Sequence, residues 1–183
     1  NNEKGTSIAM DSFGSIFITG NFNGSVDFDP DTSSFYLNSN GASDIFISKF
    51  DSSGKFIWAK SMGGSVEDLS YSLKLDLLGN IFIAGTFRGT ADFNPSINNN
   101  YLTSSGLADI FILKLNPSGN YIWVKQIGGT NNDRCNSLSL DSKGNVYTPG
   151  YFEGLADFEP NLGTYNISST GGKDVFISKL DSS

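Results

Sequence analysis

The apolar residues of this chain come in short runs that are separated by Gly, Asn, Asp and Ser. The segments 16–19, 45–48 and 56–59 are rich in Ile, Phe and Trp, a composition typical of β-strands. Apolar residues occupy both alternation phases, because Ile16 and Ile18 point to one face of a strand and Phe17 to the other. This pattern predicts strands that are buried on both faces, as in stacked sheets. No segment keeps a helical period, so we expect helix to be scarce.

The same pattern recurs along the chain with a constant spacing of 65 residues. Each copy contains Asp-x-x-Gly before a strand, then Asp-Phe-x-Pro, then Asp-[Ile/Val]-Phe-Ile-x-Lys, and the register never shifts. These motifs begin at Asp11, Asp76 and Asp141, at Asp27, Asp92 and Asp157, and at Asp44, Asp109 and Asp174. A period of this size indicates stacked supersecondary units. We therefore divide the chain into units 1–65, 66–130 and 131–183.

Each unit is predicted to contain about four antiparallel strands. In the middle unit these are 71–75, 81–87, 109–115 and 121–127, and the excursion 89–106 adds a hairpin from 91–93 and 101–104. Gly20, Gly85 and Gly150 lie inside strands, which indicates a bulge or a close approach of backbone. Short strands in tandem, rich in Gly and aromatic residues, predict an all-β fold of β-propeller-like blades. A β-solenoid is the alternative, and its usually shorter coils make it less favoured.

The third unit has no counterpart of residues 54–65, the segment that carries Trp58 in the first unit. Propellers close with about four to eight blades, so three units are too few for a ring. We expect an open arc, an incomplete ring cut from a longer array, whose last unit lacks its final strand.

The repeated residues carry a resemblance to a known family. The run Gly-x-Ile-Phe-Ile-x-Gly-x-Phe, then Asp-Phe-[Asp/Asn/Glu]-Pro, then Asp-Ile-Phe-Ile-x-Lys and Ile-Trp-x-Lys, resembles the bacterial β-propeller repeat called SBBP. It covers nearly the whole chain. Such repeats are typical of long secreted or surface proteins of bacteria, notably Bacteroidota that export through the type IX system. The resemblance implies an architecture and an extracellular or cell-surface location, and no catalytic residues.

Composition excludes several functions. The net charge is −7 and no basic cluster is present, so we expect no nucleic-acid binding. No apolar run approaches the ~18 residues of a membrane span, so we expect no membrane insertion. Histidine is absent, which removes the commonest general base and metal ligand and argues against an enzyme. Cys135 is the single cysteine and is interpreted as a small residue in a packed site.

One loop has the chemistry of a calcium site. Asp27, Asp29 and Asp31 place three carboxylates at alternating positions, and Ca²⁺ prefers clustered oxygen ligands. The equivalent loops keep the first Asp and the Pro, but they have fewer carboxylates at the other two positions. The favoured alternative is a turn in which Asp accepts backbone N–H groups. We therefore expect no cofactor, with Ca²⁺ as the one candidate.

The other repeated polar and aromatic residues are expected to serve the unit itself. Asp44 and its copies are interpreted as turn caps, Lys49 and its copies as partners of a neighbouring strand or unit, and Trp58 and Trp123 as core between units. The adjacent pair Glu67 and Asp68 is interpreted as a solvated turn.

Sequence favours a non-catalytic extracellular module, a structural scaffold or protein-interaction platform of a larger protein. Its partners would be other blades of the same longer chain or a surface or secretion complex. A glycan- or calcium-dependent adhesin is the alternative, and an enzyme domain is disfavoured. The loops that diverge between units are the predicted binding loops. They are bounded by Asp31 and Tyr36, by Ser96 and Tyr101, and by Asn161 and Asn166.

Overall fold

The computed structural model describes residues 2–181, and every regular element within them is a β-strand. No helix that could span a membrane is found in this part of the chain. The strands are β1 (Asn2–Met10), β2 (Ile16–Asn23), β3 (Ser25–Asp27), β4 (Tyr36–Asn38), β5 (Asp44–Phe50), β6 (Phe56–Gly64), β7 (Leu69–Leu75), β8 (Ile81–Phe87), β9 (Thr90–Asp92), β10 (Tyr101–Thr103), β11 (Asp109–Leu115), β12 (Tyr121–Gly129), β13 (Arg134–Cys135), β14 (Ser139–Leu140), β15 (Val146–Asp157) and β16 (Asn166–Leu180).

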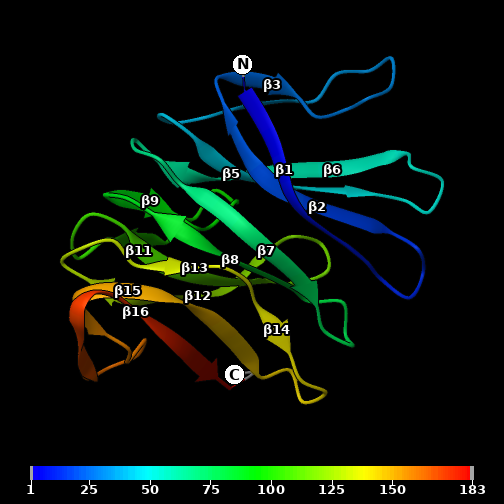
Figure 1. The fold of residues 1–183 in the computed structure, drawn as a ribbon. Coiled ribbons are helices and arrows are strands. Elements are labelled where there is room, and N and C mark those ends of the chain that lie inside the picture. The colour runs from blue at the N-terminus through cyan, green and yellow to red at the C-terminus, as the bar shows by residue number, and fades with distance from the viewer. Residues whose placement is uncertain (1, 182–183) are drawn as a thin grey trace.

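Antiparallel pairing follows the order of the strands along each unit. The first unit pairs as β1-β2-β5-β6 and the second as β7-β8-β11-β12, while β13 and β14 both pair with β15, and β15 with β16. In the middle unit the strands and the added hairpin β9–β10 lie where the sequence predicts them, within two residues at each end. The all-β, propeller-like prediction is thereby confirmed. Figure 1 shows the three units stacked in chain order, from blue through green to orange and red.

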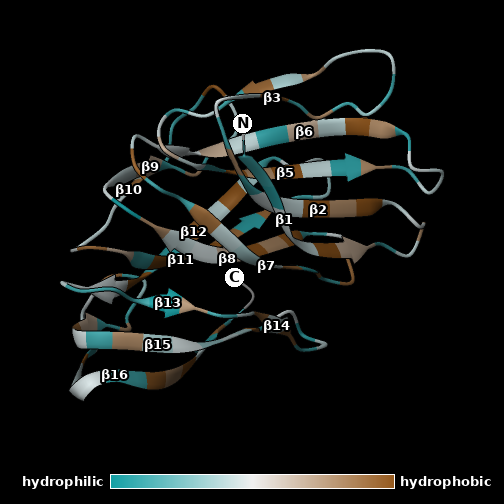
Figure 2. Ribbon diagram, turned by 45° about the horizontal axis from the view of Figure 1, so that its top comes forward, coloured by the Kyte–Doolittle hydropathy of each residue, from teal (hydrophilic) through white to brown (hydrophobic). Residues whose placement is uncertain are grey.

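The two larger apolar clusters lie between units, and a third, smaller cluster lies inside the first unit. At each junction one set of positions in a unit packs against a different set in the next unit, and the same two sets recur at both junctions. The strands of the middle unit are therefore covered on both faces. The first cluster includes Phe17, Ile45, Ile47 and Met62 of the first unit with Leu73, Ile81, Ile83, Phe87 and Phe111 of the second. The second cluster includes Phe82, Ile110, Ile112 and Ile127 of the second unit with Leu138, Val146, Phe152 and Phe176 of the third. All seven residues of β8 are buried as a result. Hydrophobic stretches run along β2 and β6 (Figure 2).

Glycine is needed where a first strand crosses closely over the second. A Cβ on Gly85 would lie 2.0 Å from the Leu69 carbonyl oxygen and 2.5 Å from the Phe111 ring. The register of β7 against β8 shifts between Ser70 and Ser72, directly opposite this position. The bulge and close approach predicted from Gly85 are therefore both present.

The arc is open at the third unit within residues 2–181. β5 pairs with β2 and β6, and β11 pairs with β8 and β12, whereas β16 pairs with β15 alone. Val175 and Ile177 on β16 are 82% and 76% exposed, although their counterparts Ile110 and Ile112 are fully buried. Within residues 2–181, the outer edge of β16 is therefore unpaired.

Candidate functional site

The predicted calcium loop directs its carboxylates at its own backbone. Asp27 Oδ1 accepts hydrogen bonds from the N–H groups of Asp29 and Phe35, at 3.1 and 2.7 Å. Asp29 accepts the Asp31 N–H through Oδ1 and the Ser33 hydroxyl through Oδ2. Among the described residues no three acidic, His or Cys side chains come together as a metal site would require. These bonds fit the turn interpretation, and calcium binding here stays a prediction.

The predicted binding loops are exposed. Tyr36 and Tyr101 are 61% and 60% accessible, and Asp31, Ser96, Asn161 and Asn166 are exposed as well. The first two loops each join a short hairpin, β3–β4 and β9–β10, and the third joins β15 to β16. They are accessible, and Asn161 also accepts a hydrogen bond from Lys125 of the second unit.

The repeated Asp residues cap turns as expected, and they are also buried in pairs. Asp44 Oδ2 accepts the Asn40 N–H at 3.0 Å, while its Oδ1 has no partner among the described residues. Asp68 accepts the N–H groups of Gly64 and Arg88. Asp44 Oδ1 and Asp68 Oδ2 lie 2.8 and 3.0 Å from the point where a Cβ on Gly63 would be. A carboxyl group from each of two neighbouring units is thus enclosed at the junction.

Asp68 corrects the solvated-turn interpretation of the Glu67–Asp68 pair, because Asp68 is completely buried. Burial raises the pKa of Asp44 to about 6 and that of Asp68 to about 7, and the charge of Asp44 adds to the shift at Asp68. The second junction repeats the arrangement with Asp109 and Asp133, whose pKa values burial also raises. The sequence shows that an Asp recurs at positions 44 and 109. It does not show that Asp68 and Asp133 are buried beside these residues.

The remaining repeated side chains hold neighbouring strands and units together. Lys49 and Lys114 lie over the rings of Phe17 and Phe82, at 4.8 and 5.1 Å from the ring centres. Lys60 donates to the Gly119 carbonyl at 2.8 Å, across the first junction. Cys135 is buried with its thiol against the Gly85 carbonyl, and burial raises the pKa of that thiol to about 12. This position is filled by Ser70 at the first junction, where the hydroxyl donates to the Gly20 carbonyl.

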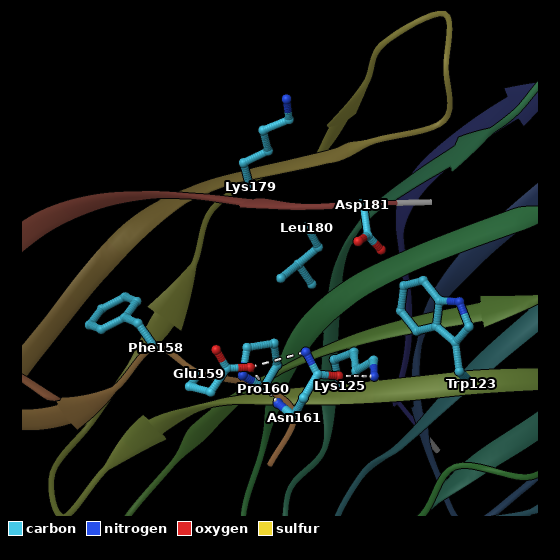
Figure 3. Close-up of a pocket in the computed structure, with 9 residues that line it drawn as sticks. All are labelled: Trp123, Lys125, Phe158, Glu159, Pro160, Asn161, Lys179, Leu180 and Asp181. Carbon is cyan, nitrogen blue, oxygen red and sulfur yellow. Dashed lines mark hydrogen bonds between the residues drawn. The ribbon is translucent and has the colours of Figure 1, made fainter. Parts of the chain in front are cut away.

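A cavity of about 390 Å³ lies between β12 and the third unit. Figure 3 shows Trp123 and Lys125 on one side, Phe158, Glu159 and Pro160 on another, and Leu180 and Asp181 above. Lys125 Nζ donates to Asn161 Oδ1, and Asn161 donates in turn to Glu159 Oε1 at 3.0 Å. At the first junction the equivalent Trp58 and Lys60 are covered by the turn at Gly119 and Asn120.

A further cleft, of about 290 Å³, is lined by basic and aromatic residues that are not repeated at the equivalent positions of the first junction. Both arginines of the chain, Arg88 and Arg134, line it together with Lys173, Tyr71 and Tyr151. The second unit carries Leu69, Thr86 and Ala108 at the positions of Arg134, Tyr151 and Lys173. The cluster joins residues of the second and third units and does not recur at the first junction, so it is not needed to build the repeat.

The cleft residues form an alternating row of cations and aromatic rings. The Arg134 guanidinium lies 4.3 Å from the Tyr71 ring centre, and Lys173 Nζ lies 4.3 Å from that of Tyr151. Arg134 also stands directly opposite Tyr151 in the β13–β15 register. Arg88 is paired with Glu67 at 4.0 Å, whereas no ion pair is found for Arg134 or Lys173 among the described residues. The row therefore offers two positive charges that a carboxylate could neutralise. We did not predict this cleft from the sequence, although the chain has two arginines and both of them line it.

Comparison with known proteins agrees with the repeat architecture. Residues 122–151 match the family model SBBP, described as a beta-propeller repeat. The match begins in β12 and ends in β15, so it spans one junction. It supports the resemblance seen in the sequence at the level of the repeat.

A curated relative has a related description. An uncharacterized WD repeat-containing protein of Acanthamoeba polyphaga mimivirus is 25% identical over 154 residues, which is 77% of this chain. The aligned part makes up 11% of that protein, so the chain spans about a tenth of the relative it matches. The two comparisons support a non-catalytic repeat or interaction module.

Proposed function

We propose that this chain is a non-catalytic β-propeller repeat module that acts as a structural scaffold and protein-interaction platform of a larger secreted or cell-surface protein. The observation that carries the proposal is the use of the repeated side chains. The Asp, Lys and Trp positions that recur at each step are engaged in caps, ring contacts and contacts between units. None of them is left in a cleft with a nucleophile and a base, which catalysis by these groups would need.

The extracellular part of the proposal rests on the resemblance of the repeat to bacterial surface proteins, with type IX secretion as the expected export route. The acidic, His-free composition fits an exposed module. The partners we propose are other blades of the same longer chain or a surface or secretion complex.

Surface labelling of intact source cells tests the location and the partners together. An antibody raised against residues 1–183 should bind intact cells, and crosslinking in place followed by mass spectrometry should join lysines of this chain to flanking repeats or to a surface complex. Labelling that appears only after cell disruption would contradict the surface location. Crosslinking to one partner alone, an enzyme that acts on small molecules, would contradict the scaffold role.

A second candidate function is an adhesin that binds a glycan, and the cation–aromatic cleft favours it. Arg134 and Lys173 both line this cleft and each lies over an aromatic ring, and we propose that they bind the carboxylate of one acidic sugar. An array of neutral and uronate-containing glycans tests this function. Binding restricted to the acidic glycans, and lost in the Arg134→Ala, Lys173→Ala double variant but kept in a Lys55→Ala, Lys143→Ala control, is the expected result. Silence on both sets removes this candidate.

A further inference from the structure

Arg88 has more hydrogen-bonding capacity than its place in the fold uses. Its Nη1 donates to the Leu107 carbonyl at 3.4 Å, and its Nη2 donates to Asn132 Oδ1 at 3.2 Å. A guanidinium has five N–H groups, and these two bonds leave the others without a hydrogen bond within residues 2–181. The two acceptors belong to different units, so they hold the side chain at the junction with spare donors.

The first junction shows how little of Arg88 the repeat needs. Asn23 stands at the equivalent position, 65 residues earlier. Its Nδ2 donates to the carbonyl of Ala42, which is the equivalent of Leu107. A neutral amide therefore makes the same contact with the loop, and the third unit has Glu153 at this position. The positive charge of Arg88 is not required to build a unit.

The acidic partner of Arg88 is held loosely. Glu67 Oε2 lies 4.0 Å from Arg88 Nε, which is beyond hydrogen-bonding distance, and the two side chains are 49% and 39% exposed. An ion pair between accessible groups contributes little to stability. A carboxylate that bonds the guanidinium fork directly makes two short N–H···O bonds, so such a ligand can displace Glu67 at small cost.

Arg134 faces the same cleft from the third unit. Its guanidinium lies over the Tyr71 ring, and neither a hydrogen bond nor an ion pair is found for this guanidinium within residues 2–181. Packing of a ring against one face of a guanidinium leaves its N–H edge open to an anion. Arg88 and Arg134 both lie at the junction of the second and third units, so the cleft has an arginine from each of the two units.

The lining of the cleft matches a ligand that has acidic groups and hydroxyl groups together. The two arginines offer N–H donors to acidic groups, whereas Glu67 and Asn132 offer oxygen acceptors to hydroxyl groups. A sugar acid carries both kinds of group. The side chains of an acidic peptide bring no hydroxyl donor for Glu67. The volume of about 290 Å³ is at the small end of ligand sites, which fits a short oligosaccharide.

We propose that Arg88 and Arg134 bind two acidic groups on adjacent sugars of one uronate-containing oligosaccharide, and that Glu67 is an internal counter-ion which this ligand displaces from Arg88. The inference rests on the acidic-glycan candidate above and adds a second acid-binding position to it. In the free protein Glu67 partly neutralises Arg88, and in the complex it accepts a sugar hydroxyl. The cleft consequently distinguishes a chain of uronates from a single uronate.

Calorimetric titration of the intact 183-residue chain tests the two acid-binding positions. The probes are galacturonate, digalacturonate, mannuronate and dimannuronate at low ionic strength, with the dimethyl ester of digalacturonate as the uncharged control. One diuronate should bind about tenfold more tightly than its monouronate, and the ester should not bind. Arg88→Asn, the residue type of the first junction, should remove this advantage and leave monouronate binding unchanged. Arg134→Gln should weaken binding of both.

Glu67→Gln tests the counter-ion, because the amide keeps an oxygen acceptor and loses the charge. It should strengthen diuronate binding about threefold, in line with the small energy of an exposed ion pair. Glu3→Gln removes an exposed acid of the first unit and is the charge-matched control, which should bind like wild type. Circular dichroism melts of each variant verify that it is folded.

The results that would overturn the inference are distinct from those that would remove the glycan candidate. Monouronate binding with no gain for either diuronate, or an Arg88→Asn variant that keeps the gain, would overturn the second position alone. Weaker diuronate binding by Glu67→Gln would overturn the counter-ion role. Hexaglutamate that binds as tightly as the diuronates would identify a peptide site instead. No binding of any uronate would remove the glycan candidate and this inference with it.

Discussion

At the residue scale, two carboxyl groups from neighbouring units are buried together at each junction. Asp44 and Asp68 meet at Gly63, where the missing side chain leaves room for them. Their raised pKa values mean that the folded state holds protons that the unfolded chain, with an ordinary aspartate pKa of 3.8, releases. The pair therefore stabilises the fold below pH 4 and loses that contribution as pH rises through 6 to 7.

Asp44→Asn should raise stability at pH 8, on the order of 1 kcal/mol, and change it little at pH 3.5, below the ordinary aspartate pKa of 3.8. An amide keeps an acceptor for the Asn40 N–H and places a donor toward Asp68 where Oδ1 now has no partner. Denaturant melts of wild type and variant at both pH values measure the difference. Asp51→Asn is the control of opposite sign, because the Ser53 hydroxyl lowers the pKa of Asp51. A variant that is less stable than wild type at pH 8 would contradict the raised pKa.

At the scale of strands, the first strand of a unit crosses the second so closely that only glycine fits between them. The Leu69 carbonyl on β7 and the Phe111 ring on β11 enclose Gly85 of β8. The bulge in β7 brings Ser70 opposite Gly85, and the thiol of Cys135 accordingly reaches the Gly85 carbonyl from the next unit. One glycine thus sets both the pairing within a unit and the contact with the next.

Gly85→Ala should destabilise the chain by about 3 kcal/mol, because a methyl group there forces backbone and ring apart in a packed core. Gly172→Ala is the matched control, since a Cβ on Gly172 would meet nothing within 4 Å, and it should be close to neutral. Chemical denaturation of both variants gives the comparison. Equal loss in the two would show that the close approach is not what requires glycine.

At the scale of the molecule, stability is shared between units because each of the two larger apolar clusters draws residues from two of them. A unit separated from its neighbour would expose half of a cluster. Repeat proteins of this kind couple through nearest-neighbour interfaces. The first and second units should consequently unfold together.

Single-tryptophan variants measure this coupling. Trp123→Phe leaves Trp58 to report on the first unit, and Trp58→Phe leaves Trp123 to report on the second. The two fluorescence transitions in guanidinium chloride should share one midpoint when each is referred to circular dichroism of the same variant. A Trp58 transition well below the dichroism transition would show that the first unit unfolds alone.

The sequence by itself determined the repeat, the strand positions of the middle unit and the burial of both strand faces. These features follow from local chemistry, because the alternation of apolar and polar residues, the turn residues and the repeat period can all be read along the sequence. It also indicated that Asp44 caps a turn and that Cys135 fills a packed site. Each of these side chains acts on neighbours that the repeat itself predicts.

Only the tertiary structure decided which side chains of different units meet. Burial of Asp68 beside Asp44 depends on how the Gly63 end of one unit faces the start of the next, and no local pattern records that geometry. The same holds for the row formed by Tyr71, Arg134 and Lys173, which come from β7, β13 and the β16 strand. Whether a carboxyl is solvated or enclosed is set by the neighbour that packs on it, since burial is a property of the assembled surface and not of the residue.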